Sequence, residues 1–493
     1  MSFTYQLCTE EAGFNAEDVD RDILAERLKE SVAEDKGRIY RRLADILSFS
    51  TASHSHFGND TKASTGVAVC HPYIYTVSKD RHLTKWQIPD PASPAKKPKQ
   101  VLHAWCAAQK SDKDYECGHI GEILTVAASQ DGKFVATGGK DNWVVVWSPE
   151  TLTPLKIFKQ HRSPVMGLVF RRNTNQMYSC SADRTVKSWS LDELAYVETL
   201  FGHQDEVVGI TALANERCVT VGARDRTARL WKIVDETQLV FRGGGESKKR
   251  KDPGGDYFTE GSMDCVTMID EEHFVTGSDN GSISFWAINK KKPIFTVSVA
   301  HGKPDPLPPS RYTAESDVST SAFPPPPSQP RPITALAAVP YSDTFFSGSH
   351  DGYVRVWRIS SDKKRIEPIG RLGIPDNPAP SMGDAVVEEG AKTAVSSKTA
   401  PTPVKVNPPA RGVVNGISVF ETGEKRDVRG GGVAGDHLYV VVALGKEMRL
   451  GRWLKVPGKN GAVLFKVPRK EVEKPKRLPL PPPVVDMNDV DLE

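Results

Sequence analysis

The sequence lacks long hydrophobic runs and paired cysteines. Nowhere among its 493 residues do roughly 18 apolar residues follow one another, so no membrane-spanning helix is expected. The start, MSFTYQLCTEEAGF, has neither the basic first residues nor the apolar run of a secretory signal. Its seven cysteines are scattered and never form a Cys-x-x-Cys pair, which argues against disulfides and zinc. These absences predict a soluble intracellular protein with no metal and no membrane contact.

Signatures of catalysis are also missing. The sequence contains no Gly-x-x-x-x-Gly-Lys-Ser/Thr phosphate loop and no His-Glu-x-x-His zinc motif. A glycine run, RGGGVAG at 429–435, falls in a predicted loop rather than at a strand-to-helix turn. The chain is therefore not expected to be an enzyme, and it is expected to need no cofactor.

Charge is distributed unevenly along the chain. Residues 1–47 carry eleven Asp and Glu against seven Lys and Arg, and the last ten residues carry four acids and no base. Because the whole chain has a formal net charge of +3, residues 48–483 have a net charge of +11. A basic body between acidic ends suits a polyanionic partner, although a solvated surface of mixed charge is the commoner reason for many Lys and Arg.

A short motif recurs three times at one spacing. A histidine is followed after 22 residues by an aspartate and after six more by a tryptophan. The three copies are His119, Asp141 and Trp147; His161, Asp183 and Trp189; His203, Asp225 and Trp231. The second half of the motif recurs ahead of Trp86, Trp286, Trp357 and Trp453. Seven units result, and the acidic position is degenerate in two of them, where Asn280 and Glu447 stand.

Each unit reads as short alternating strands joined by turns rich in Gly, Ser, Asp and Asn, as in FVATGG followed by NWVVVW. This pattern resembles the WD-repeat family, so an all-β, seven-bladed WD-repeat β-propeller is expected. The resemblance implies a buried chain of hydrogen bonds through His, Ser or Thr, Asp and Trp in each blade. Complete sets would be His119, Thr137, Asp141, Trp147 and His161, Ser179, Asp183, Trp189.

The fourth unit is expected to be incomplete, because Val221 stands ten residues before Trp231, where the hydroxyl belongs. The His and Asp side chains look superficially like catalytic pairs. Their repetition from unit to unit favours a structural role, since a buried aspartate needs partners in every blade.

Insertions divide the chain further. We expect a helical extension over residues 1–50, the propeller over 51–467 and a Pro-rich acidic tail over 468–493. Long loops within the propeller are predicted at 241–262, 302–332 and 375–411, whose composition cannot form a core. All three would lie on the face that also carries the Gly-His loops, which we call the top face.

The residue before each acidic position should also lie on the top face, and it is basic in most units. Ordinary surface lysines explain any single one, but a ring of them would bind phosphates. The RNA-binding candidates are Lys79, Lys140, Arg224, His350 and Lys446, together with Lys248, Lys249, Arg250 and Lys251 of the SKKRK run.

Ahead of the repeats, apolar residues at helical spacing predict an amphipathic helix that docks on the propeller or, with slight preference, on a partner. They are Ile23, Leu24, Leu28 and Val32, and then Ile39, Leu43, Ile46 and Leu47.

Several stretches add a closer resemblance. They are RLKESVAEDKGRIYRRLA, FRRNTNQMYSCSADRTVKSW, YVETLFGHQDEV, EEHFVTGSDNGSISFW and LGKEMRLGRW. With these the chain is similar to the WD-repeat proteins of the U3 small nucleolar ribonucleoprotein (snoRNP). The resemblance implies a nucleolar, non-catalytic subunit that recognises the box B/C element of U3 RNA with a small kink-turn-binding protein. It would act in the small-subunit processome and contact other processome proteins, with the N-terminal helix as a candidate contact.

Three matters stay open in the sequence. A WD-repeat adaptor that binds only proteins, such as a substrate receptor, is the alternative function, and it would have no need of a basic ring. The last blade could close on an N-terminal strand within SFSTASHSHF or on AVLFKV. The run SKKRK could also serve as a nuclear-import signal.

Overall fold

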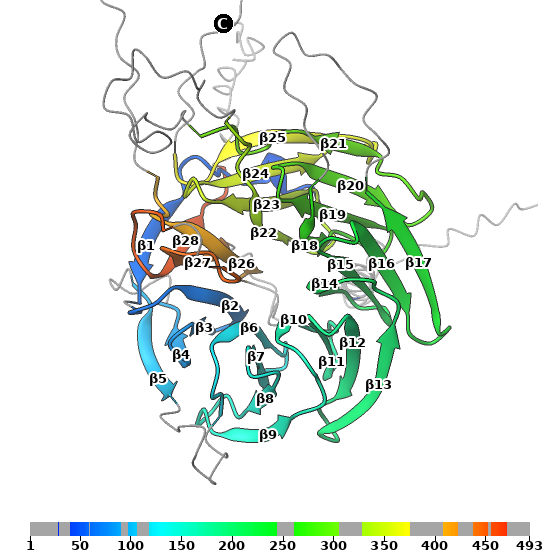
Figure 1. The fold of residues 1–493 in the computed structure, drawn as a ribbon. Coiled ribbons are helices and arrows are strands. Elements are labelled where there is room, and N and C mark those ends of the chain that lie inside the picture. Colours follow the sequence, from blue (N-terminus) through cyan, green and yellow to red (C-terminus); the bar gives the residue numbers. More distant parts are fainter. Residues whose placement is uncertain are drawn as a thin grey trace, which may run out of the picture.

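Seven four-stranded antiparallel sheets stand around one central axis like the blades of a propeller (Figure 1). This confirms the predicted seven-bladed, all-β propeller. The structure is a computed structural model. It describes Leu28 and residues 40–58, 60–89, 97–105, 118–243, 261–304, 328–374, 408–422, 437–451 and 455–470.

Each blade, numbered 1 to 7 in chain order of the inner strands, contributes one strand to each of four concentric layers. The innermost strands are β2 (Ser64–Cys70), β6 (Ile123–Ala128), β10 (Val165–Phe170), β14 (Val207–Ala212), β18 (Met263–Met268), β22 (Ile333–Ala338) and β26 (Val413–Glu421). The second strands are β3 (Tyr73–Ser78), β7 (Val135–Gly139), β11 (Gln176–Ser181), β15 (Arg217–Gly222), β19 (His273–Ser278), β23 (Thr344–Ser349) and β27 (Leu438–Gly445). The third strands are β4 (His82–Gln87), β8 (Val144–Trp147), β12 (Thr185–Ser190), β16 (Thr227–Lys232), β20 (Ile283–Ala287), β24 (Val354–Ile359) and β28 (Gly461–Val467). The outermost strands are β5 (Lys99–Trp105), β9 (Pro154–Phe158), β13 (Ala195–Phe201), β17 (Thr237–Arg242), β21 (Phe295–Val297), β25 (Ile366–Arg371) and β1 (Ser53–Phe57).

The core lies between the blades, because the inner strands of each sheet are covered on both faces by the neighbouring sheets. β27, with the sequence LYVVVALG, is buried along its whole length, whereas the outermost strand β5 is mostly exposed. Trp189 of blade 3 is fully buried and packs on Phe158 of blade 2, with ring centroids 4.5 Å apart. Such contacts explain why the second strands, such as β11, and the third strands, such as β12, are buried along most of their length.

The ring closes through pairing of the two ends of the propeller. β1, from the N-terminal side, pairs antiparallel with β28, and β28 pairs with β27 (Figure 1). Both segments that the sequence offered for closure are therefore used, SFSTASHSHF as the outermost strand and AVLFKV as the third. Blade 7 is thus built from both ends of the propeller, with β1 from the N-terminal side and β26, β27 and β28 from the C-terminal side.

The seventh repeat signature is placed differently from the prediction. In blade 3 the motif ends within the third strand, at Trp189, whereas the motif ahead of Trp453 continues past the end of β27 at Gly445 and β28 begins only at Gly461. By strand register, Phe465 opposite Val440 occupies the place that Trp189 opposite Met177 has in blade 3. The tryptophan count therefore gave the right number of blades, although the last signature extends into the connection between β27 and β28. Trp453 itself lies outside the described residues.

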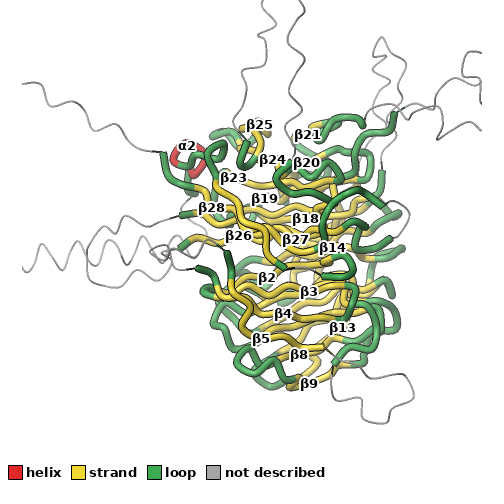
Figure 2. The backbone as a smooth tube through the Cα atoms, turned by 90° about the vertical axis from the view of Figure 1, so that its left-hand side faces the viewer, coloured by secondary structure: helices red, strands yellow, loops and turns green. Residues whose placement is uncertain are grey.

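The N-terminal helix is not shown, because residues 1–39 apart from Leu28 lie outside the described part of the chain. The described end of the predicted helix contains one short helix, α2 (Leu43–Ile46). Its backbone N–H groups at Leu43 and Ala44 donate to the carboxylate of Asp343 in blade 6. Leu47 and Phe49 are buried in the core of blades 6 and 7. This end of the extension therefore docks on the propeller itself, at the edge seen in Figure 2.

Candidate RNA interface

Hydrogen-bonded chains fix the top of blades 2 and 3. In blade 3 the indole Nε1 of Trp189 lies 2.8 Å from Ser179 Oγ, which lies 2.7 Å from His161 Nε2. Nδ1 of the same imidazole lies 2.9 Å from the Asp183 carboxylate. A carboxylate can only accept, so Nδ1–H donates to Asp183; because burial lowers the pKa of His161, Nε2 carries no proton and accepts from the serine hydroxyl, which in turn accepts from the indole N–H. His161 is therefore a neutral imidazole, held in one tautomer.

Blade 2 repeats the arrangement with His119, Thr137, Asp141 and Trp147. Trp147 Nε1 donates to Thr137 Oγ1 over 2.7 Å, and the hydroxyl lies 2.8 Å from His119 Nε2. Nδ1 of His119 is 3.0 Å from the Asp141 carboxylate, which also accepts the backbone N–H groups of the Gly-His loop. The aspartate thus ties the turn after the second strand to the loop that enters the blade.

Blade 4 also has a complete chain, contrary to the expectation from Val221. Thr220 Oγ1 lies 2.8 Å from both His203 Nε2 and Trp231 Nε1, and His203 Nδ1 lies 2.7 Å from Asp225. The turn between β15 and β16 is one residue longer than its counterpart in blade 3, since Val221 pairs with Ala228 where Cys180 pairs with Val186. Counting back a fixed distance from Trp231 therefore missed the hydroxyl by one position.

A further chain lies in blade 6, where the motif spacing did not predict one. His301 Nε2 lies 2.8 Å from Ser347 Oγ and its Nδ1 lies 2.9 Å from Asp351, while Trp357 Nε1 donates to the same hydroxyl over 2.8 Å. His301 precedes Asp351 by 50 residues because a long insertion separates them. A histidine just upstream of the insertion, rather than one at 22 residues, was the signal that could have identified it.

The pKa shifts in these chains match a structural role. Burial lowers the pKa of His161 and of His301 despite the adjacent carboxylates, so both rings stay neutral near pH 7. Burial alone would raise the pKa of the Asp183 carboxyl, but hydrogen bonds from His161 and Thr185 hold it well below its usual range. The hydrogen-bonding groups of these side chains are engaged within the blade, as a structural role requires.

Three of the predicted rim bases are exposed on the top face. They are Lys140, Arg224 and Lys446, which lie in the turns after β7, β15 and β27. Lys140 lies 3.7 Å from the carboxylate of Glu122, and its side chain remains 62% exposed. Lys248, Lys249, Arg250 and Lys251 lie outside the described residues.

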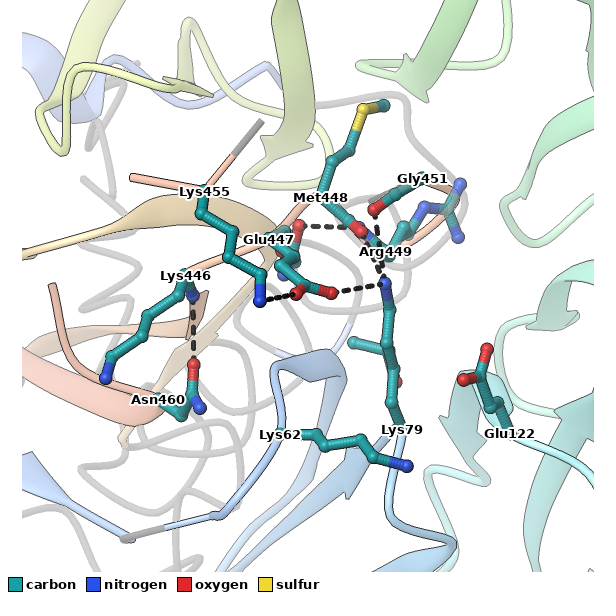
Figure 3. A network of polar contacts seen from close by, with 12 residues as sticks. Lys62, Lys79, Glu122, Lys446, Glu447, Met448, Arg449, Gly451, Lys455 and Asn460 are labelled. Atoms are coloured by element: carbon teal, nitrogen blue, oxygen red, sulfur yellow. Dashed lines mark hydrogen bonds and ion pairs between the residues drawn. The ribbon is translucent and has the colours of Figure 1, made fainter. Parts of the chain in front are cut away.

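The structure removes Lys79 and His350 from the cationic rim. The Lys79 side chain is only 2% exposed, and its ammonium donates to the carbonyls of Met448 and Gly451 at 2.8 and 3.3 Å (Figure 3). Lys79 therefore anchors the connection between β27 and β28 and does not face solvent. His350 is half-buried, and burial lowers its pKa, so its imidazole is uncharged near pH 7.

The same connection brings Arg449 to the central axis. Its guanidinium donates to the carbonyl oxygens of Met166 and Val208, on β10 and β14, at 2.9 and 3.0 Å. Its backbone N–H donates to Asn415 on β26 over 2.9 Å. Through its side chain and its backbone N–H, this one residue joins the inner strands of blades 3, 4 and 7. A cavity of about 370 Å³, lined among others by Lys79, Glu122, Lys140 and Met166, opens beside it on the top face.

A second set of top-face bases was not predicted from the repeat. An arginine follows the aspartate in the turns of blades 1, 3 and 4, at Arg81, Arg184 and Arg226. Each adopts a left-handed backbone conformation, with φ of 68°, 67° and 52°. Arg184 and Arg226 are exposed, as is Arg162 in the loop that enters blade 3. The recurring dipeptide Asp-Arg was the signal that could have identified them.

Neither a membrane-spanning helix nor a metal-binding cluster occurs among the described residues. No helix there has the length and apolar character needed to cross a bilayer. Nor do those residues bring together a group of three or more His, Cys, Asp or Glu side chains able to hold a metal ion.

Fold and hydrogen-bonded chains together define a WD-repeat β-propeller protein. The WD40 family, described as "WD domain, G-beta repeat", matches residues 113–148, 152–190, 195–232 and 322–358. Ribosomal RNA-processing protein 9 of Saccharomyces cerevisiae is 38% identical over 493 residues, spanning 90% of this chain and 78% of the relative. U3 small nucleolar RNA-interacting protein 2 of Homo sapiens is 32% identical, spanning 96% of this chain and 80% of the relative.

Solved structures give the same grouping. The crystal structure of the RRP9 WD40 repeats has a TM-score of 0.62 at 28% identity and covers 86% of this chain and 99% of its own. The structure of U3-55K has a TM-score of 0.61 at 28% identity, with 84% and 98% coverage. The chain belongs to the RRP9/U3-55K family of WD-repeat proteins. The names of these relatives describe RNA processing and RNA interaction, in keeping with the prediction of a non-catalytic protein.

Proposed function

We propose that this protein is a non-catalytic, RNA-binding and scaffolding subunit of the U3 snoRNP. It would recognise the box B/C element of U3 snoRNA together with a small kink-turn-binding protein and act in small-subunit pre-rRNA processing in the nucleolus. Family membership supports this proposal, because the relatives are named for ribosomal RNA processing and U3 interaction. The predicted N-terminal amphipathic segment would contact other processome proteins.

The single observation that carries the RNA-binding role is the exposed basic character of the top-face turns. Lys140, Arg224 and Lys446 project from separate blades held in fixed positions by the propeller, and Arg184 and Arg226 lie on the same face. An A-form RNA duplex hides the base edges of its major groove, so rigidly spaced cations can recognise its shape through phosphates and 2′-hydroxyls. A duplex bent by the kink-turn protein would present such a shape.

Charge reversal at two of these bases tests the proposal. The variant Arg224→Glu with Lys446→Glu should bind reconstituted box B/C RNA, carrying the kink-turn protein, more weakly than the wild type. The logarithm of the binding constant falls as the logarithm of the salt concentration rises, and each lost phosphate contact makes this fall shallower by about 0.7 to 0.9. Two lost contacts should therefore make it shallower by about 1.4 to 1.8. The melting temperature should stay the same, because neither residue belongs to a hydrogen-bonded chain.

The matched control reverses two exposed lysines on the opposite face, Lys290→Glu with Lys364→Glu, which lie in turns between third and outermost strands. It changes the net charge equally and should leave the salt slope unchanged. Equal binding by both variants and the wild type at low and high salt would contradict the RNA-binding role. Such a result would favour the protein-only adaptor, the alternative that the sequence left open.

A further inference from the structure

The outermost strands of blades 1 to 4 end at the top edge in residues that alternate between aromatic and basic. β5 ends at Trp105, β13 ends at Phe201 and β17 ends at Arg242, while Lys159 directly follows β9. Trp105, Phe201 and Arg242 each lie opposite the first residue of the third strand, namely His82, Thr185 and Thr227. In blade 2, Phe158 pairs with Val144, so Lys159 stands opposite Trp143, the residue before Val144. The four side chains therefore occupy equivalent places, which we call the outer rim.

The aromatic side chains of the outer rim are exposed without contributing to the core. Phe201 is 72% exposed and Trp105 is 53% exposed. Side chains alternate along a strand, so the preceding residues, Leu200 and Ala104, pack against the core instead. Neither ring belongs to the core cluster that contains its neighbour, so packing of the core does not account for an aromatic residue at these two positions.

Strand register also places turn arginines beside two positions of the outer rim. Arg184 precedes Thr185, the residue opposite Phe201, and Arg226 precedes Thr227, the residue opposite Arg242. Arg184, Arg226 and Arg242 are all exposed. The outer rim is thus continuous with the basic turns of the top face.

Two contacts that involve aromatic rings occur at the outer rim. In blade 1, His82 stacks on Trp105 with ring centroids 5.8 Å apart and an interplanar angle of 20°. In blade 2, the Lys159 ammonium lies 4.5 Å from the centre of the Trp143 ring. Flat exposed rings alternating with cations are the arrangement that binds single-stranded nucleic acid, since bases stack on the rings and phosphates face the cations.

We propose that an unpaired segment of RNA follows the outer rim, with one base stacked on Phe201 and another on Trp105. Lys159, Arg184, Arg226 and Arg242 contact the phosphates between and beside these bases. This inference rests on the proposed RNA-binding function and adds a second mode to it, since the duplex would be held by the inner turns. A protein partner could also use exposed aromatic rings, but the alternation with cations along one edge favours a polyanionic strand.

Binding of two oligonucleotide probes by the full chain tests the proposal. One is a single-stranded oligoadenylate of about 12 nucleotides, and the other is the same strand with abasic sites, which keeps the phosphates and removes the bases. Phe201→Ala and Trp105→Ala should each weaken binding of oligoadenylate by about 5- to 150-fold, the loss expected for one stacked base. Both variants should bind the abasic strand as the wild type does.

Two control variants sharpen the result. Phe201→Leu keeps an apolar side chain without a flat ring and should lose most of the same affinity, whereas Phe201→Trp should retain it. Val234→Ala changes another side chain that is 72% exposed, in the turn between β16 and β17 on the opposite face, and should have no effect. The measurement is a titration of each labelled RNA followed by fluorescence anisotropy, with circular dichroism confirming the fold.

The outcomes separate this inference from the proposed function. If both alanine variants bind oligoadenylate and the abasic strand like the wild type, while the Arg224 and Lys446 charge reversal still weakens box B/C binding, only the outer-rim inference fails. If the charge reversal also has no effect, the RNA-binding function itself fails. If Phe201→Ala lost affinity equally for oligoadenylate and for the abasic strand, base stacking on Phe201 would be refuted as the source of binding.

Discussion

Replacing Asp183 by alanine should destabilise the propeller, chiefly because one buried hydrogen bond is lost. The carboxylate accepts Nδ1–H of His161, the backbone N–H groups of Arg162 and Thr185, and the Thr185 hydroxyl. The His161 side chain is fully buried, so its N–H would have no replacement partner, whereas water can reach the loop donors. An orphaned buried donor costs about 1 to 3 kcal/mol, and the loop bonds add about 1 kcal/mol more. We therefore expect a loss of about 2 to 4 kcal/mol in the free energy of unfolding.

Urea unfolding of the full chain measures this loss, with Asp192→Ala as the control. Asp192 is an exposed aspartate that accepts a hydrogen bond from Asn175 over 2.7 Å, and its removal should change stability by less than about 0.5 kcal/mol. The folded pKa of Asp183 is lowered, so its contribution is present above the unfolded pKa of about 3.9 and is lost as pH falls further. The difference between wild type and Asp183→Ala should therefore shrink below about pH 4. Equal unfolding midpoints for the Asp183 and Asp192 variants at pH 7 would refute the reasoning.

Two more predictions concern the central axis. Arg449→Met should lower the free energy of unfolding by about 1 to 3 kcal/mol, because the carbonyls of β10 and β14 lose their donor. The control Lys455→Met, at an exposed residue nearby, should leave the free energy of unfolding unchanged. Equal melting temperatures for the two variants would contradict this role of Arg449. Burial raises the pKa of the Asp264 carboxyl from 3.8 to about 6, so ionisation of this group opposes folding above that pH. Asp264→Asn should therefore stabilise the protein at pH 7 by up to about 3 kcal/mol and leave it unchanged below about pH 4. A lower melting temperature at pH 7 would instead identify Asp264 as a required counter-ion of Arg449.

The fold could be predicted because its repeat is local. Within one unit the distance from His161 to Asp183 and Trp189 is set by three short strands and the two turns between them, so sequence spacing reports geometry directly. The prediction failed where a turn or a connection changed length. One extra residue before Asp225 concealed Thr220, and the insertion after His301 concealed the chain of blade 6.

The candidate interface was predicted less well than the fold. The residue before each acidic position does lie in a top-face turn, but its exposure depends on what neighbouring blades place above it. Lys79 is covered by the connection that follows β27, a segment almost four hundred residues away, whereas Arg224 is open to solvent. The turn arginines were missed because the prediction considered only the residue before the aspartate. Lys248, Lys249, Arg250 and Lys251 stay predictions.

The sequence by itself determined the number of blades, the hydrogen-bonded side chains of blades 2 and 3, and the basic character of the turns. These follow from residues close together along the chain, whose relative positions the strand period and the turn length fix. Only the tertiary structure decided how the ring closes, which bases reach solvent, and that Trp105, Lys159, Phe201 and Arg242 share one rim. Each of these depends on contacts between distant segments, and sequence spacing carries no information about which segments the closed ring brings together.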